Sequence, residues 1–232
     1  KEYYNYYGYC KLIFEGEYLN GMRWTGKGYD IKDNIIYELK NGNGKVREYV
    51  KEFSLRFEGE YLNGKRNRKG KEYNEYVRLI FEGEYLNGKR NGLGKEYDIN
   101  NRIEFEGEYV NGKRCGKGKI YDMGRLEFEG ELLGSYKITG REYVNGRLAY
   151  EGEYLDNKKW NGKGFDENGN IVYEIKDGKG NIREYDYYGM LWFEGEYLNG
   201  EWNGKGKEYD YEGKLIFEGE YLNGKKWNGI VK

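Results

Sequence analysis

Proline, histidine and glutamine are absent from this sequence of 232 residues, and cysteine occurs only twice. A chain of this length normally carries about a dozen prolines, so the composition is strongly biased. Without histidine there is no Ser-His-Asp or Cys-His relay, no imidazole metal ligand and no imidazole pH switch. Cys10 and Cys115 match no metal-binding or redox spacing, and we interpret them as unpaired thiols of a reducing compartment.

Long apolar runs and an excess of one charge are also missing. No segment approaches the roughly 18 apolar residues of a spanning helix, and none has the apolar core of a signal peptide. The 40 basic and 41 acidic residues leave a net charge of −1, which removes the overall attraction to nucleic acid, so no nucleic-acid partner is expected. The protein is expected to be cytoplasmic, with a membrane-peripheral or cytoskeleton-associated position left open.

Tyrosine and glycine are abundant, with 28 and 38 residues. The low net charge and the 18% of aromatic residues argue against disorder. A mean hydropathy of −1.09 indicates a large surface for the mass, because a sphere would need more aliphatic filling. A thin or elongated fold is therefore predicted.

Internal repeats cover nearly the whole chain. The block Phe-Glu-Gly-Glu, or Tyr-Glu-Gly-Glu, recurs along the chain, and two degenerate copies that begin at residues 37 and 173 fill the longer gaps. This predicts about ten units of 20 to 24 residues in one continuous array over residues 1–232, with a partial unit at 1–13 and an irregular unit near 128–149. Four unit starts recur with a constant offset of 136 residues, which indicates duplication of a multi-repeat block. The units begin near residues 14, 37, 57, 81, 105, 128, 150, 173, 193 and 217.

One well-formed unit, residues 79–97, shows how the repeat is expected to fold. Phe81, Gly83 and Tyr85 alternate with glutamates, which predicts a strand with aromatic rings on one face and carboxylates on the other. Asn-Gly dipeptides predict tight turns, and Lys-Glu-Tyr at 95–97 predicts a second strand. The recurring glycine on the aromatic face predicts a gap for a ring from a neighbouring strand. One hairpin buries too little surface to be stable alone, so we expect an all-β fold, an elongated single-layer antiparallel sheet of stacked hairpins with a right-handed twist.

The pattern Phe-Glu-Gly-Glu-Tyr-Leu-Asn-Gly-Lys-Arg-Asn-Gly-x-Gly, at residues 81–94, resembles the MORN (membrane occupation and recognition nexus) repeat. That family has an aromatic-x-Gly-x-aromatic strand, spaced glycines and a Gly-x-Gly-x-aromatic strand, and the match recurs in register from about residue 14 to the C-terminus. The resemblance implies a β-repeat rod that is not an enzyme and acts as a scaffold or as one module of a larger protein. It also implies phospholipid binding or docking of partner peptides along an aromatic groove.

Three departures from the family pattern have structural consequences. Tyr97 follows Gly94 by three residues instead of two, so it is expected on the opposite face unless a β-bulge intervenes. This spacing is similar to that of the bacterial-type variant repeats of some antitoxin-like proteins. The loop gains a tryptophan at positions 24, 160 and 227. The unit at Phe128 lacks the Asn-Gly-Lys loop, so a kink or an irregular loop is expected there.

No catalytic, cofactor-binding or metal-binding residue is predicted. Paired carboxylates such as Glu82 and Glu84 suit acid–base catalysis, but the pair repeats in most units, whereas an active site is normally singular. We interpret these glutamates as a solvated face that opposes basic residues of adjacent strands, each pair contributing about 0.2–1 kcal/mol. The Gly-x-Gly segments lack the Gly-Lys-Ser/Thr of a phosphate-binding loop, so we interpret them as turn and packing glycines.

Two rows of side chains are the candidate binding surfaces. Tyrosines at one phase of the repeat form the stacking core, and in a single layer their face is either shielded by lysine and arginine stems or open as a groove for a peptide or a second copy. Basic residues after the Asn-Gly turn form a ridge, which is either a solvated edge or a site for anionic head groups or an acidic partner. The candidate partner groove consists of Tyr18, Tyr61, Tyr85, Tyr109, Tyr154, Tyr197 and Tyr221. The candidate basic ridge consists of Arg66, Lys89, Arg90, Lys113, Arg114, Lys159 and Lys225.

The predicted function is a non-enzymatic repeat scaffold, without cofactors, that binds a protein partner along its aromatic groove. The first alternative is an adaptor to anionic phospholipid membranes through the basic ridge. The second is an accessory repeat region of a larger enzyme or antitoxin-like protein. Homo-oligomerisation through sheet edges or through the aromatic face is also left open.

Overall fold

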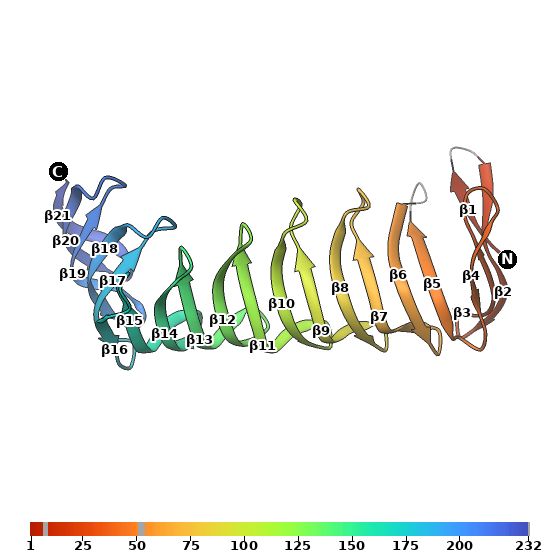
Figure 1. Ribbon diagram of the computed structural model, residues 1–232, viewed down its shortest axis with the longest axis horizontal. Coiled ribbons are helices and arrows are strands. Elements are labelled where there is room, and N and C mark those ends of the chain that lie inside the picture. The colour runs from red at the N-terminus through yellow and green to blue at the C-terminus, as the bar shows by residue number, and fades with distance from the viewer. Residues whose placement is uncertain (7–8, 51–53, 232) are drawn as a thin grey trace. The chain divides into compact units, whose positions relative to one another are not determined.

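A computed structural model describes residues 1–6, 9–50 and 54–231. The described residues form β-strands and turns and contain no helix. Successive strands pair antiparallel as hairpins (Figure 1), so the predicted all-β fold of antiparallel hairpin repeats is confirmed. The partial unit predicted at 1–13 includes residues 7–8, and the predicted array includes 51–53 and 232. These positions lie outside the described residues.

The chain divides into two compact units, Lys1–Arg114 and Cys115–Lys232. In the first unit, β1 to β4 pair in sequence order, and β5 to β10 also pair in sequence order in another sheet. In the second unit, β11 to β16 pair in sequence order, and so do β17 to β21. The first unit contains β1 (Glu2–Tyr6), β2 (Tyr9–Leu19), β3 (Met22–Tyr29), β4 (Ile35–Leu39), β5 (Gly44–Val50), β6 (Ser54–Leu62), β7 (Lys65–Tyr73), β8 (Leu79–Leu86), β9 (Lys89–Tyr97) and β10 (Ile103–Val110).

The strand β11 (Lys113–Asp122) begins at the last two residues of the first unit and continues in the second. That the whole of 1–232 forms one continuous array stays a prediction. The second unit further contains β12 (Arg125–Leu133), β13 (Tyr136–Val144), β14 (Arg147–Leu155), β15 (Lys158–Phe165), β16 (Ile171–Ile175), β17 (Gly180–Tyr185), β18 (Leu191–Leu198), β19 (Glu201–Tyr209), β20 (Leu215–Leu222) and β21 (Lys225–Val231).

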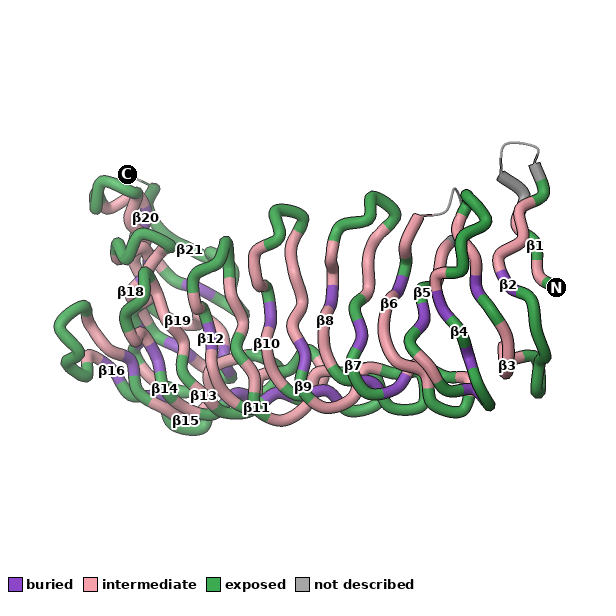
Figure 2. Tube along the Cα trace, turned by 45° about the vertical axis from the view of Figure 1, so that its right-hand side comes forward, coloured by how far each residue is buried: buried purple, intermediate pink, exposed green. Residues whose placement is uncertain are grey.

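The strands bury one face, as the alternating pattern predicts. On β8, Phe81 is 0% exposed and Tyr85 only 3%, and most buried positions lie within the strands, while the connections between hairpins are mainly exposed (Figure 2). We call the face that carries Phe81, Gly83 and Tyr85, and its equivalents in every hairpin, the inner face, and the opposite one the outer face. Glutamates of the outer face pair with lysines of adjacent strands, for example Glu82 with Lys71 at 3.6 Å.

Paired glycines hold the two strands of a hairpin unusually close together. Gly83 lies opposite Gly94, and a Cβ atom on Gly83 would lie 2.6 Å from the Gly94 Cα and 2.7 Å from the Leu93 carbonyl oxygen. The predicted gap for a ring is present. The ring over Gly83 is that of Phe81 from the same strand, however, while the Tyr109 ring of the next hairpin reaches Gly94.

Asn-Gly turns close the hairpins and dock them on one another. Asn87 and Gly88 have φ angles of 52° and 87°, the positive values of a turn that matches strand twist. The Gly88 amide donates to the Arg66 carbonyl of the preceding hairpin at 2.8 Å, and the Gly112 amide does the same to Arg90. These turns are therefore tied to their neighbours by backbone hydrogen bonds.

The connections between hairpins depend on a capping aspartate or asparagine. The carboxylate of Asp98 accepts hydrogen bonds from the amides of Asn100 and Arg102, both at 2.8 Å. Asp210 binds the amides of Glu212 and Lys214 in the same way, at 2.9 Å. Such Asx turns reverse the chain without proline, which this sequence lacks.

The predicted departures from the repeat are accommodated locally. Tyr97 lies on the outer face, because its hydroxyl donates to the outer-face Glu82 at 2.5 Å. The hairpin at Phe128 pairs Phe128 with Glu142, shifts register between Glu131 and Leu132, and closes through a turn at Gly134. The hairpin of β2 and β3 has the same shift at the equivalent place, between Glu17 and Tyr18. A Cβ on Gly42 would lie 2.6 Å from the Trp24 ring, so that loop tryptophan packs on a turn glycine.

Candidate interaction surface

The tyrosines predicted to line a partner groove are mostly buried. Tyr85, Tyr109, Tyr154, Tyr197 and Tyr221 are buried, Tyr61 is half-buried, and only Tyr18 is exposed, at 43%. Their rings therefore form the core, and a partner on the inner face would contact the side chains that cover these rings. The hydroxyl of Tyr18 donates to Glu2 at 2.9 Å, and burial together with this bond raises the pKa of Tyr18 to about 12.

Tyr85, Tyr109 and Tyr221 each pack edge-on between two phenylalanines. The Tyr85 ring lies 5.6 Å from Phe81 on its own strand and 5.3 Å from Phe57 of the preceding hairpin, with interplanar angles of 88° and 82°. Tyr109 repeats this arrangement between Phe81 and Phe105. Edge-to-face contact is the favoured geometry of aromatic pairs, so the rings tie neighbouring hairpins together.

The seven residues predicted to form a basic ridge lie on two faces. Arg66, Arg90 and Arg114 project over Phe57, Phe81 and Phe105, with each guanidinium carbon 4.0 to 4.3 Å from the ring centroid. Lys159 lies over Tyr150 in the second unit in the same manner. The other three are exposed at the hairpin turns, because adjacent strand residues point to opposite faces. They are Lys89, Lys113 and Lys225.

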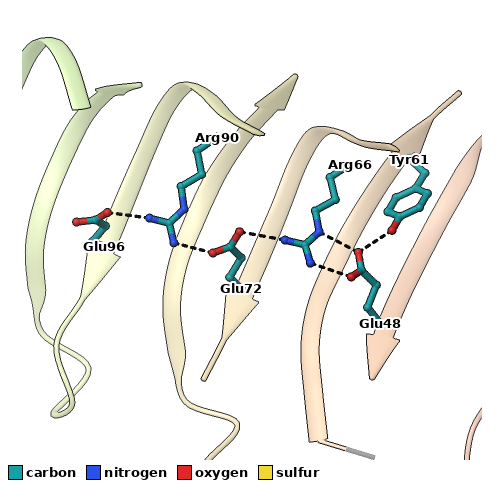
Figure 3. A network of polar contacts seen from close by, with 6 residues as sticks. All are labelled: Glu48, Tyr61, Arg66, Glu72, Arg90 and Glu96. Atoms are coloured by element: carbon teal, nitrogen blue, oxygen red, sulfur yellow. Dashed lines mark hydrogen bonds and ion pairs between the residues drawn. The ribbon is translucent and has the colours of Figure 1, made fainter. Parts of the chain in front are cut away.

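The inner-face arginines belong to a ladder of alternating charges, which Figure 3 shows in part. Arg66 binds Glu48 through two nitrogens, at 2.9 and 2.8 Å, and reaches Glu72 at 3.1 Å. Arg90 lies between Glu72 at 2.6 Å and Glu96 at 2.8 Å. We call Glu48, Arg66, Glu72, Arg90, Glu96 and Arg114 the inner ladder.

The inner ladder is electrically neutral and only partly shielded. Its three arginines and three glutamates cancel, and their side chains are 18% to 29% exposed. The Tyr61 hydroxyl adds a hydrogen bond to Glu48 at 2.7 Å, and burial, then the charge of Glu48, raises the pKa of Tyr61 well above its ordinary value. The hydroxyl therefore stays a donor at neutral pH.

The ladder glutamates were not among the residues singled out from the sequence. The signal for them exists, because Glu72 stands two residues after Gly70, and Glu96 two residues after Gly94. Strand alternation places residues at that spacing on the same face as the inner glycine. The Lys-Glu-Tyr repeat thus encodes one glutamate that faces inward, which composition and net charge do not reveal.

The second unit has a lysine version of the same arrangement. Glu142 accepts a hydrogen bond from the Lys137 ammonium at 2.9 Å and pairs with Lys159 at 3.2 Å. Burial opposes the ionised form of Glu142, but the ammonium groups of Lys159 and Lys137 hold its pKa below the ordinary value. The carboxylate therefore remains charged.

Comparison with known families now identifies the repeat. The model of the MORN repeat family matches residues 57–74, 81–101, 105–123 and 193–214, and each match spans both strands of one hairpin. The chain belongs to the MORN repeat family. MORN repeats are interaction modules that generally bind proteins or membranes. Comparison with curated proteins finds no similar sequence.

The hairpin turns of these MORN units form a second candidate surface. In the first unit Leu86 pairs with Lys89 next to the Asn-Gly turn, and both side chains are exposed. Leu62 with Lys65, and Val110 with Lys113, occupy the same place in the two adjacent hairpins of the first unit, and all four side chains are exposed. We call these three aliphatic and three basic residues the turn edge.

An open groove of about 630 Å³ crosses the outer face of the second unit. Its lining includes Arg183, Lys205 and Lys207 and the same number of glutamates, namely Glu194, Glu218 and Glu220. Because these charges cancel, the groove has no preference for an ion of one sign. No group of three metal-ligating side chains occurs among the described residues. The part of the chain that the structure describes also lacks a helix long and apolar enough to cross a membrane.

Replacing Arg90 by methionine is expected to destabilise the protein by about 1–2 kcal/mol, less than for a fully buried pair because the ladder is partly exposed. The variant keeps an apolar stem over Phe81 but leaves Glu72 and Glu96 without their shared guanidinium. Urea unfolding followed by circular dichroism measures the loss. Lys95→Met is the matched control, since Lys95 makes an exposed outer-face pair at 3.5 Å and should change stability by less than about 0.5 kcal/mol. Equal losses in both variants would contradict a structural role for the ladder.

Proposed function

We propose that this MORN chain is a non-catalytic interaction module that binds a polypeptide partner along the inner face. The inner ladder is the observation that supports the proposal. It presents carboxylates and guanidinium groups in fixed order on alternate strands of the sheet, partly exposed and already oriented by one another. Successive hairpins place like groups about 10 Å apart, two strand spacings.

A polypeptide fits this surface better than an anionic membrane does. Each ladder arginine is already paired with a glutamate, so the row offers no net positive charge to a bilayer. A peptide can present donors and acceptors in alternation, which matches the alternating carboxylates and guanidinium groups of the ladder. The partner therefore contacts the ladder that covers the rings, not the rings themselves.

Peptides selected from a random phage library against the chain provide the test. Binding of the selected peptides is measured to the parent protein, to Arg90→Met and to Lys95→Met, at temperatures where all three are folded. Binding to Arg90→Met, the inner-face variant, should weaken by about tenfold or more, as expected for loss of a central charged contact. The outer-face variant should bind like the parent. Equal binding to both variants would show that the inner face is not the docking surface.

The turn edge favours a second candidate, an adaptor to anionic phospholipid. Its lysines are exposed and each has an exposed aliphatic neighbour, a combination that suits a lipid head-group region. Each basic residue near an anionic surface contributes about 1 kcal/mol. Co-sedimentation with phosphatidylcholine vesicles, with and without phosphatidylserine, checks this candidate. Binding to the anionic vesicles alone, lost in the combined variant Lys65→Gln, Lys89→Gln and Lys113→Gln, would establish it.

Self-association stays a prediction beside these two. Sedimentation velocity over a range of protein concentrations measures it, and the selected peptides provide the comparison. A dimer that a selected peptide dissociates would place the second copy on the same inner face.

A further inference from the structure

The 136-residue duplication places two equivalent inner-face sites in the two units, and one of them has lost its cation. Glu48 of the first unit corresponds to Glu184 of the second, but Arg66 corresponds to Trp202. The registers agree, since Glu48 pairs with Phe57 and Glu184 with the equivalent phenylalanine. The carboxylate is therefore retained while the guanidinium that binds it is replaced by an indole.

A second substitution in the same pair of hairpins has the same character. Arg56, the residue before Phe57, corresponds to Trp192 in the second unit. A basic residue is thus exchanged for tryptophan at both positions. Tryptophan offers the best aromatic face for a cation, and arginine stacks on it readily.

The indole of Trp202 takes the position that the guanidinium of Arg66 has in the first unit. Arg66 lies 4.2 Å above the Phe57 ring, and Trp202 stacks on Phe193 at 4.3 Å with an interplanar angle of 15°. Trp192 packs edge-on against Trp202 at 5.0 Å. Both tryptophans keep part of their surface exposed, so a planar group can reach them from solvent.

Glu184 is left with weak compensation for its charge. Among the described residues no basic side chain lies within salt-bridge distance of it, and the ammonium of Lys159 pairs with Glu142 instead. Burial raises the pKa of Glu184, although Lys159 and the Trp202 indole favour its ionised form. In the first unit the equivalent carboxylate is bound by two nitrogens of one guanidinium.

We propose that Glu184, Trp192 and Trp202 form a binding site for an arginine side chain of a partner polypeptide. The guanidinium stacks on the exposed indole surface and donates two hydrogen bonds to the carboxylate, as Arg66 does to Glu48 within the first unit. Arginine is preferred to lysine because its planar fork matches both the carboxylate and the indole. This inference rests on the proposed function and specifies what the partner presents to the second unit.

Nuclear magnetic resonance of the isotope-labelled full chain provides the test. The probe is an acetylated Gly-Gly-Arg-Gly-Gly amide, and the control is the same peptide with citrulline, which has the shape of arginine without its charge. The arginine peptide should shift the indole N–H signals of Trp192 and Trp202 and bind at least about tenfold more tightly than the citrulline peptide, because a charged fork is replaced by a neutral one. Equal affinity for the two peptides, or shifts confined to other tryptophans, would overturn the proposal.

Two variants separate a binding role from a structural one. Trp202→Arg restores the arrangement of the first unit, so it should fold, bind Glu184 internally and lose at least about tenfold in affinity for the arginine peptide. Trp227→Arg adds the same charge at a tryptophan that is 70% exposed, and should bind the peptide nearly like the parent. Unchanged binding by Trp202→Arg would overturn the proposal. If selected peptides bind the inner ladder but the arginine peptide does not bind at Glu184, the arginine site is refuted and the proposed function stands.

Discussion

Replacing Phe81 by alanine is expected to lower the free energy of unfolding by about 3–5 kcal/mol, the range for truncating a buried phenylalanine. The ring is fully buried and packs against Tyr85, Tyr109 and the Arg90 guanidinium. The cavity cannot close easily, because the hairpins on either side are held by backbone hydrogen bonds. Urea unfolding followed by circular dichroism gives the global loss, and hydrogen exchange of the β8 and β9 amides shows where it falls.

Leu93→Ala is the matched control for this variant. Leu93 belongs to the same hairpin but is 63% exposed, so its truncation should change stability by less than about 0.5 kcal/mol. If Phe81→Ala cost no more than Leu93→Ala, the inner face would not be the core. Loss of protection confined to β8, β9 and their direct neighbours is expected of a repeat fold, since each unit contacts only adjacent ones.

Replacing Gly83 by alanine is expected to cost about 3 kcal/mol or more, at the upper end for overpacked sites. The new methyl group would lie 2.6 Å from the Gly94 Cα and 2.7 Å from the Leu93 carbonyl oxygen, so the two strands must separate. Backbone atoms cannot rotate away as a flexible side chain does. The melting temperature and the urea midpoint both measure the effect.

Gly88→Ala distinguishes this clash from the general cost of changing a glycine. Gly88 has a φ of 87°, and no atom lies within 4 Å of the place that an alanine methyl group would occupy. Alanine there meets only the left-handed backbone penalty of about 1–2 kcal/mol. A larger loss at Gly88 than at Gly83 would mean that turn conformation, not strand proximity, explains the regular spacing of glycines within this repeat.

The fold was predictable to a large extent because its signals are local and repeated. Alternation around Gly83 identified the buried face, and the Asn87-Gly88 dipeptide identified the turn. The outer position of Tyr97 followed from parity alone. The irregular unit at Phe128 stays a prediction: a turn at Gly134 replaces the missing Asn-Gly pair, and the strands shift register between Glu131 and Leu132.

The candidate surface was predictable only in part. Tyrosines of the predicted groove occupy the expected inner face, but five of the seven are buried, and Tyr85, for example, packs against phenylalanine. The basic residues were grouped by sequence position, and strand alternation then separates Arg90 from its neighbour Lys89. Pairing of Arg66 with Glu72 joins residues of one hairpin, whereas pairing with Glu48 crosses to another. Such partners depend on register between strands, which a single sequence does not display.

The sequence by itself determined the repeat, the hairpin, the buried face and the positions of the turns, because each depends on residues within about one period of one another. Only the tertiary structure decided which charges neutralise each other and which carboxylate is left without a guanidinium. The physical reason is that electrostatic partnership depends on distances across neighbouring hairpins. Glu48 and Glu184 occupy equivalent places in the sequence, yet Arg66 binds the first while an indole stands beside the second.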